Sequence, residues 1–260
     1  MANFKDKTII VTGAGYGIGK ATALAFGREG ADVVLAARSR EKLEMLAEEL
    51  RAMGTDPLVV PTDVASEIEV KQLFEETMSR YQKLDVLVNN AGITGPTKLA
   101  QEIKAEEWLE TLNVNLTGAF YCAKHAIPIM VAQKRGSIVN ISSVAGRIAY
   151  PLRTPYAASK WGMIGLSHSL AAELGGDGIR VNVVIPGPIE GERINKVIAD
   201  RAEAEKRSFE EVRDAFVSPI PLKRIPTEEE VANAILYFAA DTSAAITGQA
   251  LNVDGGYHMH

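Results

Sequence analysis

The chain has 260 residues, 47% of them hydrophobic and 23% charged, which is the composition of an ordinary soluble globular protein. A formal net charge of −5 argues against nucleic acid as a partner. The one cysteine, Cys122, excludes an internal disulfide and indicates a reducing compartment.

Signals for export, membrane insertion and metal binding are missing from the sequence. The residues before the first predicted strand contain no secretory signal, and no apolar run approaches the ~18 residues that a membrane helix needs. The four histidines do not form a pattern of metal ligands. We therefore expect a cytoplasmic protein that binds neither a membrane nor a metal ion.

Short β-branched runs alternate with longer amphipathic segments along the whole chain. The short runs predict strands at 8–12, 32–36, 57–60, 86–89, 136–141, 180–185 and 249–253. The longer segments predict helices at about 18–29, 40–53, 67–78, 105–115, 118–133, 156–174 and 227–240. Such alternation, with no linker or repeat, predicts one α/β domain over 1–260. We expect a doubly wound Rossmann-type fold with a mostly parallel seven-stranded sheet and helices on both faces.

A glycine-rich turn follows the first predicted strand. Missing side chains let a diphosphate approach the backbone, and the next helix offers free N–H groups and a positive dipole end. Ile18 stands where the usual G-x-G-x-x-G spacing needs its third glycine, so the pattern is Thr-Gly-x-x-x-Gly-x-Gly. We expect a dinucleotide here; the alternative is a tight strand–helix turn without a ligand. The predicted contacts are Gly13, Gly15, Tyr16, Gly17, Ile18 and Gly19.

The end of the second strand is informative about the choice between NAD and NADP. An acidic residue there binds the 2′-hydroxyl of NAD, whereas an arginine accommodates the 2′-phosphate of NADP. Arg38 follows this strand, and the next carboxylate is Glu41. A guanidinium can form a fork with a phosphate, so NADP(H) is favoured and NAD(H) remains possible. The alternative for Arg38 is a solvated arginine at a helix start.

Two later strand ends are predicted to complete the cofactor site. Asp63, with Val64 beside it, follows the third strand and would either accept a hydrogen bond from the adenine amine or cap the next helix. Asn90, Ala91 and Gly92 close the fourth strand, where small residues would let the backbone lie against the adenosine ribose. The alternative for this segment is a plain Asn–Gly-type turn.

Polar residues that can exchange a proton follow in the second half of the chain. Tyr156 and Lys160 share one helix face because residues i and i+4 are neighbours. A nearby ammonium favours the phenolate, so this pair is suited to general acid–base chemistry. Ser143, at the end of the fifth strand, would hydrogen-bond the substrate oxygen, or would be an ordinary strand-end hydroxyl. Asn115 would hold a water that carries the proton to solvent, or would be a buried residue at a helix kink.

Together these segments resemble the short-chain dehydrogenase/reductase family, over essentially the whole chain. The resemblance is carried by Thr12–Gly19, Asp63, Asn89–Gly92, Asn115, Ser143, Tyr156–Lys160, Pro186-Gly187 and the C-terminal segment Gly248–Gly256. It implies a catalytic tetrad of Asn115, Ser143, Tyr156 and Lys160, in which Tyr156 and Lys160 also touch the cofactor. It further implies a seven-stranded Rossmann fold and, commonly, a homotetramer.

Two departures from the family pattern concern the cofactor. Members often carry a threonine shortly after the Pro-Gly pair, but here Pro186 and Gly187 are followed by Pro-Ile-Glu-Gly-Glu. Backbone groups near Ile189 are therefore expected to contact the nicotinamide. The glycine turn carries Tyr16 in place of a basic residue, which is a mixed signal for NADP.

A long, charged, helical stretch at about 188–217 is predicted to form a lid over the substrate. Arg147 and Arg193 would meet an anionic group, although a solvated helix face is the alternative for each. The predicted pocket residues are Ile93, Thr94, Ser143, Val144, Arg147 and Arg193. The helices at 105–133 and 156–174 carry apolar residues around much of their circumference, which also favours a homotetramer.

These features predict an NAD(P)(H)-dependent oxidoreductase that interconverts a secondary alcohol and a ketone. The length of the lid favours a small polar metabolite such as a hydroxy acid, a diol or a sugar-like compound. One alternative is a 3-oxoacyl-carrier-protein reductase, which a short, open lid with a basic docking surface would favour. The other is a dinucleotide-binding regulator without catalysis, against which the intact tetrad argues.

Overall fold

The computed structural model describes residues 4–259, apart from the side chains of Arg193, Asp200 and Ala204. It contains a 7-stranded sheet in the order β3-β2-β1-β4-β5-β6-β7, with every neighbouring pair parallel. The strands are β1 (Thr8–Thr12), β2 (Asp32–Ala37), β3 (Leu58–Pro61), β4 (Val86–Asn89), β5 (Gly136–Ile141), β6 (Ile179–Pro186) and β7 (Ala250–Val253). The predicted doubly wound Rossmann fold is confirmed.

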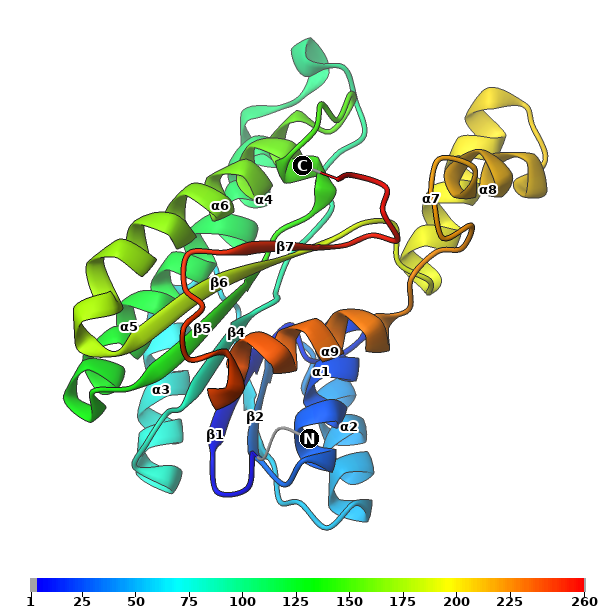
Figure 1. The fold of residues 1–260 in the computed structure, drawn as a ribbon. Coiled ribbons are helices and arrows are strands. Elements are labelled where there is room, and N and C mark those ends of the chain that lie inside the picture. The colour runs from blue at the N-terminus through cyan, green and yellow to red at the C-terminus, as the bar shows by residue number, and fades with distance from the viewer. Residues whose placement is uncertain (1–3, 260) are drawn as a thin grey trace.

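Helices cover both faces of the sheet (Figure 1). One face packs against α1 (Gly17–Arg28), α2 (Arg40–Ala52) and α9 (Glu228–Ala239). The other packs against α3 (Glu67–Tyr81), α5 (Gly118–Gln133) and α6 (Thr154–Leu174). Neighbouring residues of one strand enter different layers: Ile9 belongs to the first apolar cluster and Ile10 to the second. This two-sided burial explains why the strands are continuously apolar.

The segment between β4 and β5 differs from its prediction. A helix was expected over 105–115, but α4 (Ala105–Leu112) ends earlier and a π-helical turn, Asn113–Thr117, joins it to α5. The extra residue in a π turn changes the direction of the side chains that follow, and such turns are frequent at functional sites. Asn115 lies inside this turn and is fully buried.

Helix starts follow the capping chemistry that the sequence contains. The Ser39 and Ser66 hydroxyls accept the N–H groups of Lys42 and Glu69 at the starts of α2 and α3. Thr227 forms a capping box with Glu230 at the start of α9.

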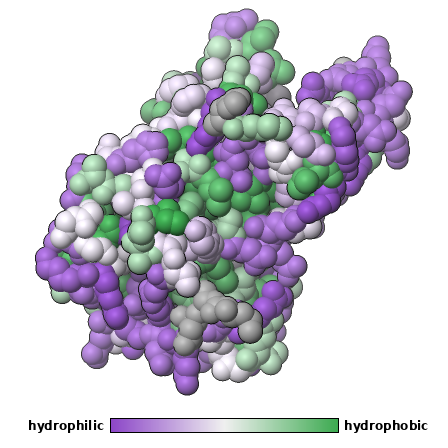
Figure 2. Space-filling model, in the orientation of Figure 1, coloured by the Kyte–Doolittle hydropathy of each residue, from purple (hydrophilic) through white to green (hydrophobic). Residues whose placement is uncertain are grey.

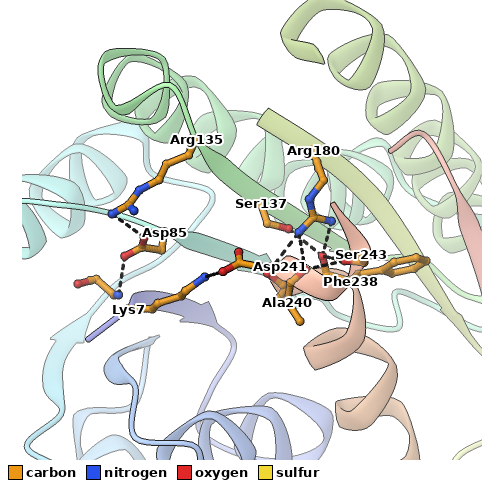
Figure 3. A network of polar contacts seen from close by, with 11 residues as sticks. Lys7, Asp85, Arg135, Ser137, Arg180, Phe238, Ala240, Asp241 and Ser243 are labelled. Atoms are coloured by element: carbon orange, nitrogen blue, oxygen red, sulfur yellow. Dashed lines mark hydrogen bonds and ion pairs between the residues drawn. The ribbon is translucent and has the colours of Figure 1, made fainter. Parts of the chain in front are cut away.

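The edge of the sheet where the amino ends of the strands lie is held by a polar network (Figure 3). Arg180 donates to the carbonyl oxygens of Phe238, Ala239 and Ala240, at the end of α9 where a helix leaves its last carbonyl groups without intrahelical partners. Burial lowers the pKa of Arg180. Because these contacts are structural, the opposite edge of the sheet is the place to look for chemistry.

The predicted lid consists of α7 (Glu192–Glu205) and α8 (Phe209–Val217). Both helices stand out from the body of the molecule, beyond the carboxyl edge of the sheet (Figure 1). They share an apolar cluster, distinct from the two sheet clusters, that includes Ile198, Val212 and Ile220. An ion pair of 2.7 Å between Arg213 and Glu190 connects α8 to the segment after β6.

Candidate active site

The glycine turn between β1 and α1 forms a tightly closed loop. Gly13 has a φ of +66°, and a Cβ atom there would lie 2.8 Å from the Cα of Ala91. A Cβ atom on Gly19 would overlap the carbonyl oxygen of Gly13 and lie 2.5 Å from the Nδ2 of Asn90. The first turn of α1 therefore packs directly on the loop, which directs its free N–H groups to the edge of the sheet.

Hydrogen bonds of Thr12 and Asn90 connect the ends of β1 and β4. The Thr12 hydroxyl donates to the carbonyl of Val88 and accepts the N–H groups of Asn90 and Ala91 at 3.0 and 3.1 Å. Asn90 donates from Nδ2 to the carbonyl oxygens of Thr12 and Gly13, at 2.9 and 3.2 Å. Sequence reasoning gave Asn90 a contact with the ribose; the structure shows that its side chain also supports the glycine turn.

The end of β2 and the start of α2 place the side chains of Ala37 and Lys42 near Gly15. Arg38 is exposed directly after β2. A Cβ atom on Gly15 would lie 3.4 Å from the Cβ of Lys42 and 3.9 Å from that of Ala37. The Nζ of Lys42 is 5.5 Å from the centre of the Tyr16 ring. Sequence reasoning missed Lys42, although its spacing of four residues from Arg38 on a helix start was a usable signal.

Asp63 does not cap α3. Its Oδ1 accepts the N–H of Ala65 at 3.0 Å, and the N-cap of α3 is Ser66. The capping alternative is therefore wrong, because Asp63 instead closes the turn before the cap. Val64 is buried against α5, where a Cβ atom on Gly118 would lie 2.8 Å from it.

Tyr156 and Lys160 lie on the first turns of α6. Lys160 is buried, with 4% of its surface exposed, and donates from Nζ to the carbonyl oxygen of Ile141 at 2.8 Å. The same Nζ is 5.7 Å from the centre of the Tyr156 ring. The end of β5 thus fixes the ammonium near the phenol, as the i, i+4 spacing predicts.

Asn115 connects the end of β4 to α6. Its Oδ1 accepts the N–H of Ile93 at 2.7 Å, and its Nδ2 donates to the carbonyl of Ile93 and the hydroxyl of Ser159. The Ser159 hydroxyl in turn donates to the carbonyl oxygen of Tyr156 at 2.7 Å. Sequence reasoning missed Ser159, which couples the π turn to the helix that carries Tyr156.

Gly92 is the point where Asn115 and Lys160 approach each other. A Cβ atom on Gly92 would lie 3.2 Å from the Oδ1 of Asn115 and 3.7 Å from the Nζ of Lys160. The alternatives of a water-holding residue and a buried helix kink are both compatible with this position, because Asn115 lies in a π turn and its Oδ1 faces the same point at Gly92 as the ammonium.

The loop after β5 holds Ser143 against α6. The hydroxyl of Ser142 donates to the carbonyl oxygen of Lys160 at 2.8 Å. A Cβ atom on Gly146 would lie 2.7 Å from that same oxygen. Between these two contacts Ser143 has an extended backbone, and its Oγ accepts the N–H of Ala145 at 3.2 Å.

Tyr150 is a second phenol beside Tyr156 that sequence reasoning did not select. Their ring centres are 6.3 Å apart. Burial raises the pKa of Tyr150, and the neighbouring Tyr156 raises it further. Tyr150 therefore remains a neutral phenol at neutral pH and packs beside Tyr156.

The remaining predicted residues lie at the same edge or close to it. Gly187 donates its N–H to Val253 after Pro186 ends β6, and Ile189 packs on the first sheet cluster. The carbonyl of Thr94 accepts a hydrogen bond from Arg153, and Val144 is buried. Arg147 donates to the carbonyl of Ala250 at 2.9 Å, which ties it to β7, and its contact with a substrate stays a prediction. The Arg193 side chain lies outside the described part of the chain.

Comparison with known proteins identifies the family. Residues 13–258 match the family model described as enoyl-(acyl carrier protein) reductase. The chain is 42% identical over 254 residues to the 3-oxoacyl-(acyl-carrier-protein) reductase FabG of Thermotoga maritima, covering 97% of this chain and 98% of that one. The chain belongs to the short-chain dehydrogenase/reductase family.

Two solved members of the family share its fold closely. A variant of actinorhodin polyketide ketoreductase, crystallised with NADPH, has a TM-score of 0.94 at 36% identity, over 100% of both chains. An NAD+-bound xylitol dehydrogenase has a TM-score of 0.93 at 31% identity, over 97% of this chain and 99% of that one. The predicted family membership is thus confirmed, and the chain is an oxidoreductase of the kind that interconverts alcohols and ketones.

Residues 4–259 contain neither a membrane-spanning helix nor a cluster of metal-binding side chains. None of the helices described there has the length and apolar character required to cross a bilayer. Histidine, cysteine and acidic side chains in the described part of the chain do not gather in groups of three that could hold a metal ion.

Proposed function

We propose that the chain reduces the 3-oxo group of an acyl thioester, carried by an acyl-carrier protein, to a hydroxyl group with NADPH. The observation that carries the proposal is the joint placement of Lys160, Asn115 and the Tyr156 helix around Gly92, in a chain 42% identical to a 3-oxoacyl reductase over nearly its full length. The relatives therefore favour the alternative from the sequence over the small polar metabolite.

The residues at the carboxyl edge fit a dinucleotide. Gly13 and Gly19 let the first turn of α1 pack directly on the end of β1, and the free N–H groups of that turn would bind a diphosphate. Arg38, at the end of β2, would contact the 2′-phosphate of NADP(H), and Asp63 would accept from the adenine amine. Asn90, Ala91 and Gly92 would lie against the ribose, with Val64 and Ile189 completing the site. When bound, the nicotinamide supplies or accepts the hydride.

Tyr156 is the proposed proton donor to the substrate. Its hydroxyl would donate to the substrate carbonyl oxygen in the direction of reduction, while the Ser143 hydroxyl holds that oxygen in place. The Lys160 ammonium, fixed by the carbonyl of Ile141, would stabilise the phenolate that forms. A water near the Oδ1 of Asn115 would return a proton from solvent. Ile93, Thr94 and Val144 would line the pocket.

A small polar substrate is the second candidate, and the lid is the observation that favours it. The helices α7 and α8 lie within 192–217 and pack around an apolar cluster of their own. A lid of this length would enclose a small molecule and exclude water from it. In that case Arg147 or Arg193 would bind an anionic group of the substrate.

A substrate comparison separates the two candidates. The purified protein is given NADPH with either acetoacetyl-coenzyme A, a thioester surrogate, or a panel of small sugars and oxo acids, and nicotinamide absorbance is followed. We expect kcat/KM for the thioester to exceed that for each small substrate at least about tenfold, and the Tyr156→Phe variant to be nearly inactive. A sugar or oxo acid that is reduced more efficiently than the thioester would overturn the proposal in favour of the second candidate.

We propose a cytoplasmic homotetramer as the assembled form. Trp161 on α6 and Phe120 on α5 expose 53% and 45% of their surfaces. Apolar side chains also gather over β7 at the sheet edge (Figure 2), where Leu251 is exposed. Exposed apolar areas of this kind mark protein–protein contacts.

The mass of the particle tests the assembly. Light scattering is expected to give about four times the 28.0 kDa of one chain. Trp161→Glu should lower that mass, because it puts a charge into the expected contact. Met45→Glu, which changes an exposed apolar residue of α2, is the matched control and should leave the mass unchanged. A 28 kDa particle at micromolar concentration would contradict the tetramer.

A further inference from the structure

We propose that Lys42 is a second cation for the 2′-phosphate of NADP(H), acting together with Arg38 across the glycine turn. The inference rests on the proposed use of NADP(H) and assigns a role to a residue of α2 that the sequence did not single out. It concerns binding of the adenosine end of the cofactor and not the hydride transfer.

The position of Lys42 follows from two contacts with the glycine turn. A Cβ atom on Gly15 would lie 3.4 Å from the Cβ of Lys42, so the stem of the lysine rests against the turn. Its Nζ lies 5.5 Å from the centre of the Tyr16 ring, which is itself 54% exposed. The aromatic face holds the ammonium over the turn instead of letting it extend into solvent.

The position of Lys42 beside Arg38 favours the binding of an anion. A Cβ atom on Gly15 would also lie 3.9 Å from the Cβ of Ala37, so the end of β2 and the start of α2 meet at this glycine. Arg38 is exposed immediately after Ala37. Two cations thus flank the place where β2 ends, which is where the adenosine ribose binds in doubly wound folds.

The other charged side chains near the end of β2 and the glycine turn either form ion pairs or are acidic. Arg40 is 3.5 Å from Glu44 and forms an ion pair on the outer surface of α2. Lys20 of α1 pairs with Glu49 at 2.8 Å. Glu41 is exposed beside Lys42 and is the acidic group that opposes an anion most directly. Arg40 therefore offers a matched control: an exposed cation, two residues from Lys42, that is engaged elsewhere.

Binding of nucleotide fragments isolates the 2′-phosphate. The full-length protein is titrated calorimetrically with 2′,5′-ADP and with 5′-AMP, which differ only in the 2′-phosphate and contain no nicotinamide. The ratio of the two dissociation constants is the selectivity for that phosphate. We expect Lys42→Ala to lower this ratio about tenfold, the size of one charge-assisted contact, while 5′-AMP binds as in the wild type.

Three further variants sharpen the test. Lys42→Arg should keep most of the selectivity because it retains the charge, and Arg40→Ala should leave the ratio unchanged. Because the Lys42 ammonium lies over Tyr16, an arginine at position 16 would bring a cation to the same place. The double variant Tyr16→Arg with Lys42→Ala should therefore regain selectivity relative to Lys42→Ala alone.

The outcomes separate this inference from the proposed function. If the wild type binds 2′,5′-ADP no better than 5′-AMP, the proposed NADP(H) preference is wrong. If the wild type is selective but Lys42→Ala and Arg40→Ala give the same ratio as the wild type, the role of Lys42 is wrong and the proposed reaction is unaffected. An equal loss of selectivity for the 2′-phosphate in Lys42→Ala and in Arg40→Ala would indicate a general effect of surface charge. That result would also overturn the role of Lys42.

Discussion

Replacing Gly19 with alanine tests whether the glycine turn is as tightly closed as its geometry indicates. The added Cβ atom would overlap the carbonyl oxygen of Gly13 and lie 2.5 Å from the Nδ2 of Asn90. Neither neighbour is the end of a flexible side chain that is free to rotate away, because Asn90 is held by Thr12 and Gly13. The start of α1 and the end of β1 must therefore move apart.

The cost can be estimated from the contacts that this movement breaks. Overpacking a closed site costs ~1–3 kcal/mol. The two hydrogen bonds that Asn90 donates, at 2.9 and 3.2 Å, contribute about 1 kcal/mol each. We expect Gly19→Ala to lower the free energy of unfolding by about 3–5 kcal/mol. The same displacement moves the backbone N–H groups from the diphosphate, so the affinity for NADPH should fall by at least about a hundredfold.

Urea denaturation at a fixed protein concentration measures the free energy of unfolding, and quenching of protein fluorescence measures the affinity for NADPH. Gly175→Ala is the matched control, because Gly175 has helical angles of −57° and −38° and its Cβ atom would meet open space. That substitution should raise the stability by about 0.5–1 kcal/mol. A Gly19→Ala protein within 1 kcal/mol of the wild type, with normal NADPH affinity, would refute the reasoning.

Four further outcomes are expected. Tyr156→Phe should lower kcat roughly 10²–10⁴-fold with unchanged NADPH affinity, measured in steady-state and binding assays. Ser159→Ala should lower the unfolding free energy by about 1 kcal/mol in urea and also lower kcat, because it uncouples the π turn from α6. Burial raises the pKa of Cys122 to about 12, so a thiol reagent should label it only after unfolding. Arg224 lowers the pKa of Glu230 to about 2 from 4.5; the stability advantage of the wild type over Glu230→Gln should be full above pH 4.5 and shrink towards pH 2 in melting experiments.

The fold was predictable because its signals are local. Continuous apolar runs such as 86–89 and 136–141 predicted strands with the observed limits of β4 and β5. The helix predicted at 227–240 likewise agrees with α9, whose capping box at Thr227 is a local feature of the sequence. Both kinds of signal depend on residues within one or two turns of each other, so they can be recognised without knowledge of the tertiary structure.

The limits of prediction appear where two distant segments meet. The sequence left the role of Asp63 open between a helix cap and an adenine contact, and only the position of Ser66 excludes the cap. Ser159 reads as a helix residue, and its role depends on Asn115, which lies 44 positions earlier. From the sequence alone, Lys42 is an ordinary solvated lysine in the first turn of a helix. Its proximity to Gly15 is visible only in the structure. Each of these contacts depends on the packing of separate elements, which periodicity does not encode.

The lid explains why the substrate was harder to predict than the reacting groups. Asn115, Lys160 and the Tyr156 backbone are held by hydrogen bonds to the segment after β4, to β5 and to α6, so they depend on the sheet and the helix packed on it. The lid helices instead pack on their own cluster around Ile198 and Ile220, outside the sheet clusters. Because the two regions have separate cores, the lid can differ between proteins without disturbing the catalytic edge. Residues that identify the chemistry therefore carry little information about the molecule on which the chemistry acts.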